Sequence, residues 1–172
     1  MIKSVLCVLI VLTCSYLGFM YGERYRKRYY NLKELQRALL QLENEILFSY
    51  TSLPIAVDNI SKKSKGEIKN FLKEVSENLS ENKFDTVYDA FSFSYERYKE
   101  KLYFNDDDIN LIGDLSKSLG EVDIVGHEKL FSLVSESIKK NIEESEDSMK
   151  KNLKMYRYLG VCLGIGIVII IL

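Results

Sequence analysis

The chain has 172 residues with a formal net charge of −1; 47% of the residues are hydrophobic and 28% are charged, with one proline and nine glycines. This apolar content excludes a disordered chain, and the scarcity of glycine and proline favours long helices over many short strands. Residues 31–154 hold 18 Lys and Arg against 24 Asp and Glu. Such an acidic middle argues against nucleic acid as a partner, because phosphate contacts need a basic patch.

The first predicted element is an apolar segment at residues 4–22, which holds no charged side chain over 19 positions. That is about the length a helix needs to cross a ~30 Å hydrocarbon core. A cleaved signal peptide is the alternative, but here the strong positive cluster, at 24–28, follows the apolar run instead of preceding it. We therefore predict a retained transmembrane anchor over 1–23, with its basic flank on the cytoplasmic side.

Three amphipathic helices are predicted next, because apolar side chains recur at spacings of three and four. Asn31 is expected to be the N-cap of a helix over about 32–50. Pro54 suits the first turn of a short second helix. A third helix has its apolar face from Ile68 to Leu79.

Three further helices complete the predicted bundle. Asp85 is expected to open the fourth, and the acidic run at 106–108 the fifth, since carboxylates favour the positive end of a helix dipole. Gly120 is predicted as the residue just after the end of the fifth helix. The sixth helix is predicted from about residue 124 to 156 and should lead directly into the last segment.

That last segment, residues 158–172, is apolar but short. Fifteen residues span about 22 Å, so the segment either crosses the bilayer or only inserts into it. Lys and Arg residues precede it, which again favours a cytoplasmic flank. We thus predict an all-α protein: a cytoplasmic bundle of about six helices over 24–157, flanked by N-terminal (1–23) and C-terminal (158–172) membrane helices.

Both apolar segments carry a pair of glycines four residues apart: Gly18 with Gly22, and Gly160 with Gly164. With both flanks cytoplasmic, the two pairs lie at matching depth, so the helices could touch backbone to backbone. The alternative is that the spacing arises by chance, because the pattern is common.

Residues for catalysis or metal binding are scarce. The one histidine, His127, has no cysteine or second histidine to complete a metal site, and the three cysteines lie in the apolar ends. No phosphate-binding loop or nucleophile motif is present. We therefore expect no enzyme, no metal and no cofactor. The aromatic side chains of the fourth helix belong to the core, or to an interface if they are more than the bundle can cover: Phe91, Phe93, Tyr95 and Tyr98.

An acidic run near the end of the bundle has two interpretations. It is either a solvated helix face or a docking surface for a partner, to which the turn at Gly120 and Glu121 would add. The acidic residues are Glu143, Glu144, Glu146 and Asp147.

Three blocks in this order point to a family: L-E-N-E-I at 42–46, T-S-L-P-I-A at 51–56, and L-G-E-V-D at 119–123. Together with the anchor, the long acidic helix and the apolar tail, they resemble the stage III sporulation protein AB family of endospore-forming bacteria, over nearly the whole chain. His127 departs from the family, which tends to have glutamine there, and this puts any role of that side chain in doubt.

The resemblance implies a function that composition does not. Members belong to the channel complex between mother cell and forespore, and their cytoplasmic domain is similar to the inner-membrane platform protein of type II secretion. The implied location is the mother cell membrane around the forespore. The implied partners are a cytoplasmic ATPase (stage III sporulation protein AA), other channel membrane proteins and further copies of the chain. The alternative is a membrane-tethered helical scaffold or signalling protein without a secretion role.

Overall fold

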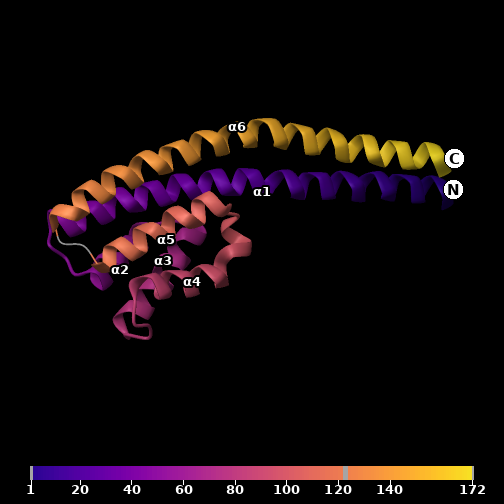
Figure 1. Ribbon diagram of the computed structural model, residues 1–172. Coiled ribbons are helices and arrows are strands. Elements are labelled where there is room, and N and C mark those ends of the chain that lie inside the picture. The colour runs from indigo at the N-terminus through magenta and orange to yellow at the C-terminus, as the bar shows by residue number, and fades with distance from the viewer. Residues whose placement is uncertain (1, 122–123, 172) are drawn as a thin grey trace. The chain divides into compact units, whose positions relative to one another are not determined.

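The structure is a computed structural model that describes the backbone of residues 2–121 and 124–171, and the side chains of residues 9–120 and 129–170. None of the described residues forms a strand, so the prediction of an all-α protein is confirmed. The structure has six helices in its described part (Figure 1): α1 Ile2–Leu47, α2 Leu53–Lys63, α3 Gly66–Ser80, α4 Val87–Leu102, α5 Asp106–Glu121 and α6 Ile124–Ile171.

The chain divides into two compact units. One, here called the paired-helix unit, comprises Met1–Tyr29 and Glu144–Leu172; the other, the bundle unit, comprises Tyr30–Glu143. Both α1 and α6 run from one unit into the other without interruption. The predicted boundaries between the membrane segments and the cytoplasmic domain, at residues 23 and 158, stay predictions.

The prediction of a helix start at Asn31 is wrong, because α1 continues through this position. No glycine or proline occurs between residues 23 and 53, so nothing in the chain breaks the helix there. The Asn31 side chain instead makes a tertiary contact. Its Nδ2 donates to the carbonyl oxygens of Leu102, at 2.9 Å, and of Lys101, at 3.2 Å. These carbonyls lie in the last turn of α4, where they have no partner within the helix.

The core of the bundle unit follows the predicted apolar faces. In α1 the stripe of leucines at spacings of three and four, including Leu32 and Leu42, is buried. Ile60 of α2, Phe71 of α3 and Ile138 of α6 have almost no exposed surface. Such a stripe on each helix removes apolar area from water at about 25 cal/mol per Å², which is the main favourable term for the bundle.

The helix ends of α4 and α5 differ from the prediction in detail. Helix α4 begins after Thr86, whose Oγ1 accepts from the Asp89 backbone N–H at 3.1 Å, so Asp85 lies outside it. The acidic start of α5 is confirmed. Gly120 lies inside α5, which extends to Glu121, so its prediction as the residue after the helix end is wrong. Its position packs against Val87, where an added Cβ would meet ordinary contacts at 3.5 Å.

Candidate helix-packing and docking sites

The glycines of the two apolar segments lie close together in the paired-helix unit. A Cβ built on Gly18 would lie 3.0 Å from the Cα of Gly160 and 2.6 Å from the backbone oxygen of Tyr156. A Cβ on Gly160 would lie 2.8 Å from the oxygen of Cys14. These distances are shorter than real Cβ contacts, so α1 and α6 approach here at a separation that only glycine permits.

Gly22 and Gly164 do not face each other. A Cβ built on Gly164 would lie 3.0 Å from the Cα of Val11, whereas a Cβ built on Gly22 would lie a looser 3.6 Å from the Cα of Leu153. The contacts describe two antiparallel helix segments in a fixed register, with the beginning of α1 beside the end of α6 (Figure 1). Three of the four predicted glycines therefore make close backbone contacts, whereas Gly22 has room for a side chain.

Aromatic and basic side chains lie together in the same unit, just past the glycine contacts. The ring of Tyr156 stacks against Tyr21 and Tyr25, with centroids 6.1 and 5.9 Å apart. The guanidinium of Arg157 lies 4.2 Å from the centroid of the Phe19 ring, and that of Arg24 lies 4.9 Å from the Tyr21 ring. Such cation–π contacts join a positive charge to an amphipathic aromatic surface.

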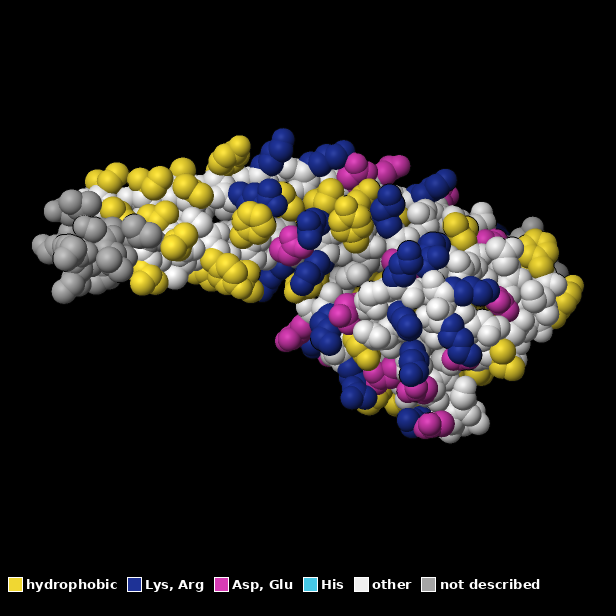
Figure 2. All heavy atoms as spheres, turned by 180° about the vertical axis from the view of Figure 1, so that it is seen from behind, with side chains coloured by type: hydrophobic (Ala, Val, Ile, Leu, Met, Phe, Trp, Pro, Cys, Tyr) yellow, Lys and Arg dark blue, Asp and Glu magenta, His cyan; other side chains and the backbone are white. Residues whose placement is uncertain are grey.

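Apolar side chains cover the outside of the paired helices. Leu12 and Leu17 of α1 are more than half exposed, as are Leu163 and Ile169 of α6. Figure 2 shows these yellow side chains spread along the paired helices. Within the described residues, α6 is the one helix that is long and apolar enough to cross a membrane, over Lys129–Ile170. An apolar surface of this extent calls for a lipid or protein cover.

The acidic run is divided between the two units. Glu143 is exposed and belongs to the bundle unit, whereas Glu144, Glu146 and Asp147 belong to the paired-helix unit. Glu146 forms a 2.7 Å ion pair with Lys150, one turn further along α6.

The structure does not bring Gly120 near Glu143. Asp108, at the start of α5, accepts a hydrogen bond from Asn141, two residues before Glu143. Gly120 lies twelve residues further along α5, which is about 18 Å at 1.5 Å per residue. The predicted docking residues therefore form at least two separate surfaces. The side chains of Glu121 and His127 lie outside the described residues.

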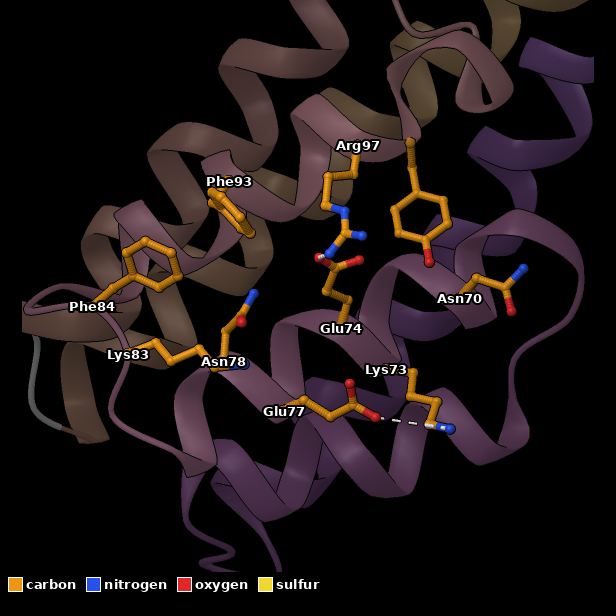
Figure 3. Close-up of a pocket in the computed structure, with 10 residues that line it drawn as sticks. Asn70, Lys73, Glu74, Glu77, Asn78, Lys83, Phe84, Phe93 and Arg97 are labelled. Carbon is orange, nitrogen blue, oxygen red and sulfur yellow. Dashed lines mark hydrogen bonds and ion pairs between the residues drawn. The ribbon is translucent and has the colours of Figure 1, made fainter.

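A groove between α3 and α4 is a surface feature that sequence reasoning did not find. It has a volume of 530 Å³ (Figure 3). Figure 3 shows Phe84 and Phe93 at one end of it, where their ring centroids are 5.1 Å apart. Near its middle, Arg97 forms a 2.8 Å ion pair with Glu74. Of the aromatic residues of α4, Phe91 is buried in the core, as predicted, whereas Phe93 is 46% exposed. The spacing of apolar residues in the sequence did not distinguish a buried from an exposed aromatic side chain in this helix.

The turn between α1 and α2 exposes two aromatic side chains. Phe48 and Tyr50 are 75% and 73% exposed, and Tyr50 has a positive φ of 50°, a backbone conformation that is unfavourable for a bulky residue. Glu45 orders the turn, because its carboxylate accepts hydrogen bonds from Thr51 at 3.1 Å and Asn59 at 3.3 Å. These bonds, with Lys63 at 3.4 Å, hold the pKa of Glu45 below its ordinary value. Exposed aromatics on an ordered turn are typical of protein contacts.

Among the described side chains, no three His, Cys, Asp or Glu residues are grouped so as to hold a metal ion. The described features instead define a helical bundle whose two terminal helices carry packed glycines and exposed apolar side chains.

Comparison with known proteins identifies the class to which this fold belongs. The family model for stage III sporulation protein AB matches residues 3–172. Stage III sporulation protein AB of Bacillus subtilis (strain 168) is 23% identical over 172 residues, which is 100% of both chains. A solved structure of stage III sporulation protein AB is similar with a TM-score of 0.66 and 20% identity, covering 72% of this chain and 97% of that one.

The chain belongs to the stage III sporulation protein AB family. This membership associates it with sporulation, and the family name carries no catalytic activity. The predicted resemblance is confirmed.

Proposed function

We propose that the chain is a membrane platform component of the channel complex between mother cell and forespore, and that it docks a cytoplasmic secretion-type ATPase. The observation that carries the proposal is the continuity of α6. This helix begins in the bundle and ends in a stretch that could cross a membrane, in a chain of a sporulation family. A bundle whose last helix continues into a membrane segment suits a protein on which other parts assemble.

Both ends of the chain are membrane helices in this proposal. The first segment carries exposed apolar side chains from Leu9 to Tyr21, and its glycines pack on those of α6. Basic residues flank both segments on the same side, so residues 24–157 lie in the cytoplasm of the mother cell. The two helices then form an antiparallel hairpin in the membrane around the forespore, where further copies and other channel proteins would pack on its outer faces.

Three surfaces are proposed for the ATPase, stage III sporulation protein AA. One is the acidic run of α6, in which Glu144 and Asp147 are exposed. The second is the ordered turn with Phe48 and Tyr50, since exposed aromatic anchors supply most of the energy of many protein contacts. The third is the turn at Gly120 and Glu121.

The test is a binding measurement between the purified full-length chain in detergent and that ATPase. We expect a saturable complex that Phe48→Ala with Tyr50→Ala weakens at least tenfold if the turn is the anchor. If the acidic run is the anchor instead, Glu144→Lys with Asp147→Lys should weaken the complex. Glu77→Lys with Glu100→Lys is the matched charge-reversal control, because both side chains are exposed on the bundle unit.

Absence of binding by the unaltered chain would contradict the platform function. It would favour the alternative of a membrane-tethered scaffold that acts through its helices.

A further inference from the structure

Basic side chains from both ends of the chain meet in the paired-helix unit. Between residues 23–28 and 150–157 the sequence has eight Lys and Arg and one carboxylate, Glu23. We call the eight the basic collar: Arg24, Arg26, Lys27, Arg28, Lys150, Lys151, Lys154 and Arg157. They are some 120 residues apart along the chain, and the structure brings them to one end of the apolar helix pair.

The helix register places the collar beside the apolar surface. Gly22 lies against Leu153, so Arg24 and Lys154 lie within about one turn of this contact on their respective helices. Two turns or less away, Phe19, Tyr158 and Leu159 expose between 47% and 72% of their surface. Figure 2 shows Lys and Arg side chains gathered where the yellow surface of the paired helices ends.

Two arginines of the collar contact aromatic rings. The guanidinium groups of Arg157 and Arg24 lie over the Phe19 and Tyr21 rings. A contact through the flat face of a guanidinium leaves the N–H groups at its edge able to donate, and this fork suits phosphate oxygens. Arg26 forms a 2.6 Å ion pair with Glu23, and Lys150 forms a 2.7 Å ion pair with Glu146. Because the two segments hold eight cations and one carboxylate, the collar keeps a positive excess.

We propose that the basic collar binds the headgroups of anionic phospholipids, and this inference rests on the proposed membrane insertion. An acidic protein or a nucleic acid would neutralise the cations but would leave the adjoining apolar and aromatic side chains in water. A phospholipid provides both interactions, because its phosphate binds the arginines and its acyl chains cover the neighbouring leucines. Clusters of this size next to a membrane helix attract negatively charged lipid at close range.

The experiment uses the full-length chain reconstituted in phosphatidylcholine vesicles, with spin-labelled lipid as the probe. The measured quantity is the association of labelled phosphatidylglycerol relative to labelled phosphatidylcholine. We expect a preference for phosphatidylglycerol of at least about fivefold, the factor that one cation near the surface supplies. It should decrease with added salt, and soluble glycerol phosphate should not displace the labelled lipid.

Variants separate the collar from general charge. Arg24→Gln with Lys154→Gln and Arg157→Gln should lower the ratio severalfold, whereas Arg24→Lys with Arg157→Lys should retain most of it. Lys62→Gln with Lys69→Gln and Lys83→Gln removes the same charge from exposed positions of the bundle unit and should leave the ratio unchanged. Circular dichroism of each variant verifies that the helices form.

Each remaining outcome contradicts a different statement. A chain that is retained in the vesicles after carbonate washing but shows equal association of the two lipids overturns the collar inference alone. Displacement by glycerol phosphate would mean that the site takes a soluble anion and would overturn the lipid assignment. A chain that carbonate removes from the vesicles overturns the proposed membrane insertion and the inference with it.

Discussion

Asp108 is a carboxylate with no exposed surface, at the beginning of α5. Its Oδ2 accepts from the Asn105 backbone N–H at 3.0 Å, and its Oδ1 accepts from Asn141 Nδ2 at 2.9 Å. Asn105 Oδ1 in turn accepts from the Asp108 N–H at 3.0 Å. The reciprocal bonds cap the helix, and the bond to Asn141 joins α5 to α6 through a buried polar contact.

We expect Asp108→Ala to destabilise the bundle by about 2–4 kcal/mol, since it removes a helix cap and leaves the Asn141 amide buried without a partner. Asp107→Ala is the control, because Asp107 is exposed in the same turn and should lose under about 1 kcal/mol. Urea unfolding of fragment 30–143, followed by circular dichroism, measures both. Equal losses would show that neither the cap nor the buried contact of Asp108 stabilises the bundle.

Glu45 makes the stability of the α1–α2 turn depend on pH. Because the pKa of Glu45 is lowered in the folded chain, its ionised form stabilises the fold at pH values above its ordinary range. That contribution is lost as the pH falls through the lowered folded pKa. Glu45→Gln should therefore have a lower unfolding midpoint than the parent at pH 7, and the difference should shrink below about pH 4.

The control for this pH dependence is Glu136→Gln, at an exposed position of α6. A Glu45→Gln difference that stays constant from pH 7 to pH 3 would contradict the role of the carboxylate charge.

At the scale of elements, α1 and α6 are packed by backbone contact through glycine. Gly18 and Gly160 approach so closely that any side chain at either position would meet backbone atoms, which have little freedom to move. Gly166 has nothing within 4 Å of a built Cβ, although it lies in the same apolar segment. Substitutions at Gly18 and at Gly166 therefore distinguish the effect of close packing from the effect of helix propensity.

We expect Gly18→Ala to separate the two helices, at a cost of about 1–3 kcal/mol for the forced overlap. Gly166→Ala should leave their distance unchanged, since alanine favours a helix over glycine. Distances between spin labels at positions 12 and 163, both exposed, measure the separation in detergent after replacement of the native cysteines. Glycine packing would be contradicted if the distance between the labels increased in Gly166→Ala, or if it did not increase in Gly18→Ala.

At the scale of the whole molecule, the proposed topology places both ends of the chain in the membrane and the middle in the cytoplasm. A single cysteine at Ser80, an exposed position at the end of α3, should react with an impermeant maleimide in inside-out vesicles. A cysteine at Lys3 or at Ile170 should react only after detergent is added. Reaction at Ile170 without detergent would mean that the C-terminal segment inserts without crossing.

The local features of the chain were predictable from the sequence, because they depend on neighbours within one or two helical turns. The spacing of Leu32, Leu35, Leu39 and Leu42 predicted a buried helix face, and these side chains are buried. The acidic start of α5 and the unbroken run of α6 into its apolar end depend on the same short-range rules. The family resemblance is also a property of sequence order alone.

Contacts between distant segments required the tertiary structure. Asn31 has the chemistry of an N-cap, but it binds the end of α4, some 70 residues away, because α1 has no breaker before it. Asp108 has the sequence of an exposed first-turn acid, and only the position of Asn141 makes it a buried partner. The pairing of Gly18 with Gly160 and the assembly of the basic collar follow from the same cause. A sequence pattern determines which face of each helix is apolar or charged, whereas packing between helices determines which faces meet.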